Sequence, residues 1–336
     1  MVRVKGTLLL EENQESLVKA AGIIKQGGLV AFPTETVYGL GAAATSRKAV
    51  KSIFAAKGRP ADNPLIVHLS DLDQLSLVAR NIPDEAKFLA GRFWPGPLSL
   101  VLPRAEDVPA EVSAGLPTVA VRMPDHPVAL ALIEFAGVPV AAPSANKSGR
   151  PSPTSYQHVL EDLTGKVDAV IRSSICKIGI ESTVLDLTGS SPRILRPGGL
   201  PQEELEKALG CNIDIAPDKK GSLLPASPGM KYRHYTPSAP LILVTGNEIK
   251  RRRLLYRLAR LYYRKGFLVG LLNFSFQHRL KFDAAPESFA AMFYSYLRRM
   301  DAAGVDIIVA EEVMLSGIGL AVMNRLKKAA TRVLKV

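Results

Sequence analysis

Cysteine is scarce in this chain, with two among its 336 residues. Cys176 and Cys211 stand too far apart for a zinc framework or a disulfide scaffold, so a reducing compartment fits and neither thiol is expected to be catalytic. No apolar run of about 18 residues is present, and the first residues, MVRVKGTLLLEENQ, carry only a short apolar patch. We therefore expect neither a signal peptide nor a membrane span, and a soluble protein of the cytoplasm.

Acidic residues are in deficit as well. There are 31 Asp and Glu against 43 Lys and Arg, which gives a formal charge of +12. This balance favours anionic partners such as nucleotides, phosphate or RNA without choosing among them. Much of the excess is local, because the stretch 250–265, KRRRLLYRLARLYYRK, holds eight basic residues and no acid.

The first two-thirds of the chain alternate between short apolar runs and amphipathic segments. Residues 14–26 and 46–56 have helical spacing of apolar residues, and Ser46 is a good N-cap. Short strands are predicted at LVAF, LIVHL, LSLVL, TVAVRM, VPVAAP, DAVI and STVLDL, with helices near 84–91, 127–136 and 154–163. Strands that alternate with helices predict an α/β fold with a central sheet covered by helices.

The signal changes after residue 202, where one short helix is followed by a stretch rich in proline and glycine. Three further apolar runs, PLILVTG, FLVGLLNF and VDIIVAEE, each precede a helical segment and predict a small parallel, Rossmann-like sheet. No G-x-G-x-x-G follows the first of these runs, so we do not expect a dinucleotide site. The predicted organisation is a large first domain over 1–209, which we expect to be the catalytic one, a connection over 210–239 and a second domain over 240–336.

Three stretches of the first domain place hydroxyls and charges directly after predicted strands or helices. They are FPTETVYGLG (32–41), AAKGRPADNP (55–64) and AAPSANKSGRPSPT (141–154). Small residues beyond the carboxyl end of a strand let backbone N–H groups approach a phosphate closely. Each stretch also has a plainer explanation, as a polar turn or as a cation at a helix end. Together they favour an anion site.

Two arginines and one histidine add to this pattern. Arg122 ends TVAVR and Arg196 lies in ILRPGG, and a guanidinium can grip a carboxylate or phosphate with two parallel hydrogen bonds. A surface ion pair of Arg122 with Asp125 or Glu134 is the alternative. His68 lies in an apolar strand, where spacing alone favours a packed core histidine.

The motifs PTETVYGLG, AKGRPADNPLIVH, FWPGPLSLVL, VAVRMPDHPVA, APSANKSGRPSPT, GIESTVLDL and ILRPGG occur in the order typical of the YrdC/Sua5 family. SPGMKYRHYTP and GLAVMNRLKKAA are similar to the two-domain Sua5 type. The resemblance covers almost the whole chain. It implies a YrdC-like twisted open sheet with flanking helices and a concave basic site, and a small Rossmann-like C-terminal domain.

The family resemblance also implies an activity, L-threonylcarbamoyladenylate synthesis, which makes the protein a nucleotidyltransferase. L-threonine, bicarbonate and ATP give threonylcarbamoyl-AMP and pyrophosphate, and the product supplies the modification N6-threonylcarbamoyladenosine at tRNA position 37. The downstream transfer machinery is an implied partner, a weak direct contact with tRNA is left open, and no membrane is involved. No metal site of the protein is expected, and Mg²⁺ would arrive with ATP.

The resemblance carries roles over to single residues. Lys57 and Arg59 correspond to the lysine-x-arginine pair of the catalytic site, with Lys57 as an electrostatic stabiliser because lysine is a cation at pH 7. The implied threonine side consists of Thr36, His68, Arg122 and Ser182. The implied ATP side consists of Arg59, Asn63, Thr118, Ala142 through its backbone, Ser144, Asn146, Ser152, Arg196 and Tyr235.

The stretch SPGMKYRHYTP suggests a lid, with Tyr235 against the nucleotide and Lys231, Arg233 and His234 near its phosphates. The alternative is a connection whose aromatic residues only pin the domains together. The chain departs from the family at Arg172-Ser173-Ser174, where an acidic-glycine-glycine turn is usual.

Two other classes of protein stay open as alternatives. A non-catalytic basic protein that binds RNA or nucleotides would explain the charge, although the first domain lacks an aromatic platform for bases. A carbamoyl-transfer module of the hydrogenase-maturation type would need cysteine-rich zinc segments, which the sequence lacks.

Overall fold

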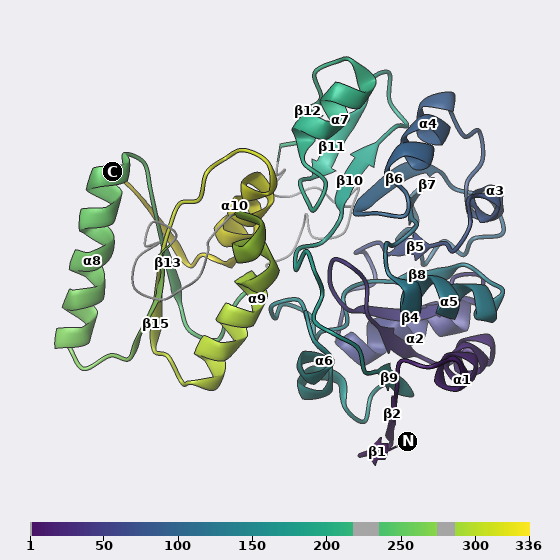
Figure 1. The fold of residues 1–336 in the computed structure, drawn as a ribbon, viewed down its shortest axis with the longest axis horizontal. Coiled ribbons are helices and arrows are strands. Elements are labelled where there is room, and N and C mark those ends of the chain that lie inside the picture. Colours follow the sequence, from purple (N-terminus) through teal and green to yellow (C-terminus); the bar gives the residue numbers. More distant parts are fainter. Residues whose placement is uncertain (1, 218–234, 274–285) are drawn as a thin grey trace. The chain divides into compact units, whose positions relative to one another are not determined.

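The structure is a computed structural model that describes residues 2–217, 235–273 and 286–336. The chain forms two compact units, Met1–Ser148 with Ser152–Tyr232, and Gly149–Pro151 with Arg233–Val336 (Figure 1). The division falls inside the connection expected over 210–239. The sequence did not indicate that residues 149–151 would belong to the second unit.

A single mixed sheet organises the first unit. Within the described residues it has twelve strands, in the spatial order β1 (Val2–Val4), β2 (Thr7–Leu10), β9 (Ala169–Ile171), β3 (Val30–Phe32), β4 (Gly39–Ala43), β8 (Val140–Ala142), β5 (Ile66–His68), β7 (Thr118–Arg122), β6 (Leu98–Pro103), β10 (Thr183–Asp186), β11 (Arg193–Arg196) and β12 (Asp214–Ile215). All seven strands predicted in this part of the chain are present, and the sequence did not predict β1, β2, β4, β11 and β12.

Within the described residues the first unit has seven α-helices, and side chains cap the starts of some of them. The seven helices are α1 (Gln14–Lys25), α2 (Arg47–Lys57), α3 (Leu75–Val78), α4 (Asp84–Phe93), α5 (Pro127–Ala136), α6 (Tyr156–Leu163) and α7 (Gln202–Leu209). Asn13 accepts a hydrogen bond from the amide of Ser16, and Ser46 caps α2 in the same way through Ala49. Gly58 ends α2 with a φ of 60°, a conformation that glycine adopts without a Cβ penalty.

The two faces of this sheet are covered differently. Helices α2, α3, α4, α6 and α7 pack on one face along most of its width. On the other face, α1 and α5 pack together over β3, β4, β8 and β9. Beyond β8, that second face carries a small apolar cluster to which no helix of the described residues contributes, formed by Ile66, Val101, Ala120, Val184 and Leu195. His68 and Arg122, two of the residues predicted to bind threonine, end strands of this part of the sheet.

The second unit is a small parallel sheet between helices, as predicted. The described strands have the order β14 (Val269–Leu272), β15 (Ile307–Glu311), β13 (Leu241–Thr245) and β16 (Arg332–Lys335). Its helices are α8 (Glu248–Arg264), α9 (Pro286–Ala302) and α10 (Ile318–Ala329). Figure 1 shows α8 on one side of the sheet and α9 and α10 on the other. The short strand β16 was not predicted.

Candidate active site

Strand alternation places the site residues. Ile66 and Ala120 belong to the small apolar cluster, so His68 and Arg122, two residues further along β5 and β7, lie on the same face of the sheet. The two strands are parallel and His68 pairs directly with Arg122. A buried imidazole and a buried guanidinium therefore lie side by side at one end of these strands.

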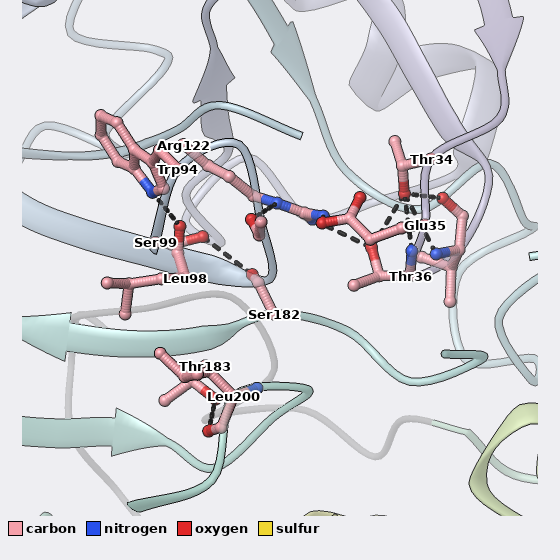
Figure 2. Close-up of polar contacts among 12 residues, drawn as sticks. Thr34, Glu35, Thr36, Trp94, Leu98, Ser99, Arg122, Ser182, Thr183 and Leu200 are labelled. Carbon is pink, nitrogen blue, oxygen red and sulfur yellow. Dashed lines mark hydrogen bonds and ion pairs between the residues drawn. The ribbon is translucent and has the colours of Figure 1, made fainter. Parts of the chain in front are cut away.

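Arg122 is the most heavily bonded of these groups. Its side chain is 4% exposed, Nε donates to the carbonyl of Gly96 at 3.1 Å, and Nη1 donates to Oγ1 of Thr36 at 2.9 Å. Nη2 forms an ion pair with Oε1 of Glu35 at 2.5 Å. Figure 2 shows the guanidinium pointing at Glu35 and Thr36 together. The surface ion pair with Asp125 or Glu134 is thus not the arrangement found.

The turn after β3 presents these two side chains to Arg122. Oγ1 of Thr34 accepts hydrogen bonds from the amides of Thr36 and Val37, both at 3.2 Å, and donates to the carbonyl of Val37 at 2.6 Å. Such a hydroxyl-to-backbone turn fixes the direction of the residues it encloses. It orients Glu35 and Thr36 into the site. Glu35 was not predicted as a site residue, although it stands inside the PTET motif.

His68 is neutral in this environment. Its Nδ1 lies 3.1 Å from the carbonyl of Ile66, and its ring meets the edge of Phe32 with centroids 6.0 Å apart. Burial and, after it, the positive charge of Arg122 lower the pKa of His68 to about 3. A neutral imidazole can exchange one hydrogen bond with a hydroxyl without adding a second cation.

Ser182 lies at a second cationic point, between β6 and β11. Its Oγ lies 2.8 Å from Oγ of Ser99, and Figure 2 shows the two hydroxyls facing each other. Arg196 donates through Nη2 to the carbonyl of Ser182 at 2.9 Å and to its Oγ at 3.2 Å. The predicted threonine residue and the predicted nucleotide arginine are therefore in direct contact. Ser99 was missed because the sequence around it does not indicate that it lies next to Ser182, which is 83 positions away.

Lys57 and the loop after β8 form one hydrogen-bonded group. The ammonium of Lys57, which ends α2, donates to the carbonyls of Ser144 and Asn146 and to Oδ1 of Asn146 at 3.3 Å. Oγ of Ser144 donates to the same Oδ1 at 2.6 Å, and the amide of Ser148 donates to the carbonyl of Lys57 at 2.9 Å. The structure thus brings together the lysine, serine and asparagine that the resemblance paired only as motifs.

Arg59 and Asn63 are joined through the turn that follows α2. Nε of Arg59 donates to the carbonyl of Asn63 at 3.2 Å, and Nη2 donates to the carbonyl of Pro64 at 2.9 Å. Asn63 is 1% exposed, whereas Arg59 is half-buried. The guanidinium consequently holds the entry to β5 in place.

Thr118, Ala142 and Ser144 lie near that same entry. Ile66 pairs with Ala120 on one side and with Ala142 on the other. Two residues before Ile66, the neighbouring positions are therefore Thr118 and Ser144. This level is four residues from His68, about 13 Å along the strand. Thr118 and Ser144 thus lie toward the start of β5 and His68 lies at its end, whereas Arg196, also predicted for the nucleotide, contacts Ser182 instead.

Ser152 is buried and donates to Oε1 of Glu181 at 2.6 Å. Glu181, in the GIEST motif, is a second buried carboxylate that sequence reasoning missed. Both of the missed carboxylates, Glu35 and Glu181, stand inside the motifs PTETVYGLG and GIESTVLDL rather than in charge runs. A single acid among apolar and hydroxyl-bearing residues is the sequence signal that could have found them.

Tyr235 belongs to the second unit. It is 5% exposed, has a φ of 64°, stacks on Tyr294 with centroids 5.5 Å apart and lies below the guanidinium of Arg325, also at 5.5 Å. The remaining residues of the predicted lid, 231, 233 and 234, lie outside the described residues. A contact of Tyr235 with the nucleotide therefore stays a prediction.

Neither a metal cluster nor a membrane helix is found in the part of the chain that the structure describes. No three of its His, Cys, Asp and Glu side chains are placed to hold a metal ion. None of its helices is long and apolar enough to cross a bilayer.

Comparison with known proteins identifies the family. Residues 22–198 match the family described as Telomere recombination, and residues 200–331 match the family described as Threonylcarbamoyl-AMP synthase, C-terminal domain. The threonylcarbamoyl-AMP synthase of Pyrococcus abyssi is 53% identical over 94% of this chain and 95% of its own length. That of Bacillus subtilis is 45% identical over 96% and 94%.

A solved structure matches along the whole chain. The crystal structure of P. abyssi Sua5 complexed with L-threonine has a TM-score of 0.91 and 50% sequence identity, and the match covers 98% of this chain and 99% of that one. The expected fold, a YrdC-like domain followed by a Rossmann-like one, is confirmed. The chain belongs to the Sua5/YrdC family of threonylcarbamoyl-AMP synthases and has the two-domain Sua5 architecture.

Proposed function

We propose that this protein is an L-threonylcarbamoyladenylate synthase, which makes threonylcarbamoyl-AMP and pyrophosphate from L-threonine, bicarbonate and ATP. The observation that carries the proposal is the buried guanidinium of Arg122, which lies beside neutral His68 and donates to Thr36, so that three residues predicted to bind threonine meet in one place. Relatives that carry the enzyme's name over nearly their full length support it. So does the relative solved with L-threonine.

The reaction needs two bond-forming steps. The ammonium group of threonine first loses a proton, the free amine attacks the carbon of bicarbonate, and water leaves as the carbamate forms. A carbamate oxygen then attacks the α-phosphorus of ATP, and the bond to pyrophosphate breaks. Because threonine carboxylate, bicarbonate and ATP are all anionic, the rate depends on fixed positive charge where these groups meet.

In this scheme Arg122 binds the carboxylate of threonine. Thr36, His68 and Ser182 bind the amine and the side-chain hydroxyl of the same substrate. His68 stays neutral and exchanges a hydrogen bond with the side-chain hydroxyl. Since an exposed guanidinium would lose much of its attraction to solvent screening, the burial of Arg122 strengthens its attraction to a carboxylate.

The nucleotide binds along Arg59, Asn63, Thr118, Ala142, Ser144, Asn146, Ser152 and Arg196 in the same proposal. Lys57 supplies positive charge to the carbamate and phosphates, and its bonds give it a further task, because its ammonium already fixes the positions of Ser144 and Asn146. Mg²⁺ would enter with ATP, held mainly by the phosphates. The cytoplasm, where ATP, threonine and tRNA meet, remains the proposed location.

The downstream step is transfer of the threonylcarbamoyl group to tRNA position 37 by separate machinery. The alternative of a non-catalytic RNA-binding protein is not favoured, because the whole chain matches named synthases.

Pyrophosphate release by the purified protein tests the proposal. Release from ATP should require L-threonine and bicarbonate together, and mass spectrometry should detect threonylcarbamoyl-AMP in the same mixture. Omission of either substrate is the control. ATP hydrolysis that ignores threonine, or ATP binding without any turnover, would overturn the assignment.

A further inference from the structure

The basic stretch 250–265 forms helix α8, and its charges fall into two groups that do different things. Arg251 lies 3.5 Å from Glu311 and 3.6 Å from Glu312, and Arg252 pairs with Glu248 at 3.1 Å. These two arginines therefore form ion pairs within the second unit. The other four arginines of α8 form no such pair among the described residues.

Arg253, Arg257, Arg260 and Arg264 follow one another at intervals of four, three and four residues, which keeps them on one face of the helix. All four side chains are exposed, and no ion pair joins any of them to an acid among the residues described. The stripe runs for about 16 Å along the axis, at 1.5 Å per residue. Four aligned guanidinium groups repel one another, so such a stripe lowers its energy when a polyanion lies along it.

The opposite face of α8 is already occupied. Leu255 is fully buried, and Leu254 and Leu258 pack with it against Val244 and Val309 of the sheet. Figure 1 shows the helix lying along that sheet. A basic helix that binds membranes inserts a free apolar face, and α8 has committed its apolar face to the sheet. An anionic bilayer is therefore a poorer partner for α8 than a polyanion in solution.

Aromatic side chains accompany the stripe. Tyr263 is 75% exposed and Tyr256 is 38% exposed, and both lie beside the arginines on the helix surface. Exposed tyrosine and arginine planes stack on unpaired bases, and guanidinium groups bind phosphates in two-pronged geometry. An acidic protein would form ion pairs with the arginines but would offer no bases to stack on Tyr256 and Tyr263. The combination favours a nucleic acid.

We propose that the arginine stripe of α8 (Arg253, Arg257, Arg260 and Arg264) is a docking surface for the sugar–phosphate backbone of a structured RNA. That the RNA is tRNA rests on the proposed function, since the adenylate product is destined for a tRNA. The contact is to backbone and shape rather than to sequence, because the stripe offers no set of base-reading groups. It keeps the synthase near the molecule on which its short-lived product is used.

The test uses the full-length protein and a fluorescently labelled tRNA transcript, with binding followed by anisotropy over a range of salt concentrations. The double variant Arg257→Ala/Arg260→Ala should bind about tenfold more weakly near 0.1 M salt. Its plot of log K against log salt should be flatter by about 1.5, since each phosphate contact contributes roughly 0.7–0.9 to the slope. Alanine keeps the helix, so the melting temperature should not change.

Lys25→Ala/Lys207→Ala is the matched control, because it removes two exposed positive charges from helices of the first unit. The control should retain nearly all of the affinity. A second stripe variant, Arg253→Gln/Arg264→Gln, should reproduce the loss of the first. Equal losses in the stripe variants and the lysine control would reduce the effect to net charge and overturn the docking surface.

The remaining outcomes separate this proposal from the proposed function. Threonine-dependent pyrophosphate release should be unchanged in both stripe variants, because none of the four arginines belongs to the catalytic site. Release by a wild-type protein that binds no tRNA would overturn the docking surface alone. RNA binding that the stripe variants abolish, in a protein without threonine-dependent release, would overturn the synthase assignment alone. If the variants weaken sedimentation with phosphatidylglycerol vesicles but not RNA binding, the surface belongs to a membrane.

Discussion

Glu35 and Arg122 form an ion pair of 2.5 Å whose two side chains are only 3% and 4% exposed. Each charge is removed from water, and each depends on the other to offset the cost of that removal. Arg122 is also the proposed clamp for the threonine carboxylate. The carboxylate of Glu35 therefore already occupies one edge of the Arg122 guanidinium, to which the threonine carboxylate is proposed to bind.

Substitution Glu35→Gln should lower the free energy of unfolding by about 3 kcal/mol, because it leaves a buried guanidinium without its counter-charge. Urea unfolding of Glu35→Gln, Arg122→Gln and the double variant measures the effect, and the double variant should lose less than the sum of the two singles. Glu11→Gln is the control, since Glu11 pairs with Arg172 at 3.5 Å where both side chains are half exposed. That variant should lose under about 1 kcal/mol. Strict additivity in the double variant would show that the pair is not coupled.

His68 gives the stability a defined dependence on pH. The pKa of His68 is about 3 in the folded protein and about 6.5 in the unfolded chain, so the unfolded state binds the extra proton between these values. The contribution of His68 is complete above pH 6.5 and is lost progressively as the pH falls towards 3. Melting temperatures of wild type and His68→Gln between pH 7 and pH 5 should show a smaller decline for the variant. His126, whose pKa is also lowered by burial, is present in both proteins, so the difference isolates His68. Parallel declines would contradict the assigned state.

Ser99→Ala should weaken threonine binding more than ATP binding. Its hydroxyl lies 2.8 Å from that of Ser182, and loss of one hydrogen bond of this kind corresponds to roughly a two- to tenfold change. Steady-state kinetics should show a raised KM for threonine, with the KM for ATP little changed. Ser76→Ala, on an exposed helix surface, is the control. Equal changes in both KM values would mean that Ser99 serves packing rather than threonine.

Tyr235 can be tested by two substitutions. Because the ring is buried against Tyr294 and Arg325, Tyr235→Ala should destabilise the second unit by about 3 kcal/mol whatever the residue does to the nucleotide. A loss of ATP affinity in that variant would therefore not establish a lid. Tyr235→Phe keeps the ring stack, so its melting temperature should stay near that of wild type. Weaker ATP binding by Tyr235→Phe, measured by calorimetry, would support a direct contact of the hydroxyl, and unchanged binding would count against one.

Much of the fold follows from local signals in the sequence. Helix starts at Asn13 and Ser46 have capping residues, and the strands β5, β7 and β10 are short apolar runs between turns. Strands β1 and β16 were missed because each reads as a few mixed residues at an end of the chain. Their pairing partners, β2 and β13, are what make them strands.

The site was predictable as a set of motif residues but not as a set of contacts. The bond between Ser99 and Ser182 exists because β6 and β10 run parallel with Leu98 opposite Thr183. The ion pair of Glu35 and Arg122 likewise joins a turn and a strand 87 positions apart in the numbering. Contacts between residues so far apart in the sequence are set by the register of the sheet, which a local stretch of sequence does not predict.

The unusual segment Arg172-Ser173-Ser174 directly follows β9 of the first unit. Arg172 lies 3.5 Å from Glu11 and 5.5 Å from the ring of Tyr156. The added cation is therefore balanced locally. The carbonyl of Ser173 accepts a hydrogen bond from Tyr38 at 3.3 Å.

The chain enters the second unit for three residues, 149–151, immediately after the loop that carries Ser144 and Asn146. There the carbonyl of Gly149 accepts from the amide of Thr236 at 2.9 Å, and that of Pro151 accepts from Arg298 at 2.6 Å. Removal of everything after residue 209 would delete neither β5 and β7, which carry His68 and Arg122, nor β10, which directly follows Ser182. It would still remove Thr236 and Arg298, which donate hydrogen bonds to the carbonyls of Gly149 and Pro151 just after Asn146. A shortened protein would thus keep the strands of His68 and Arg122 and lose an anchor of the loop that carries Ser144 and Asn146.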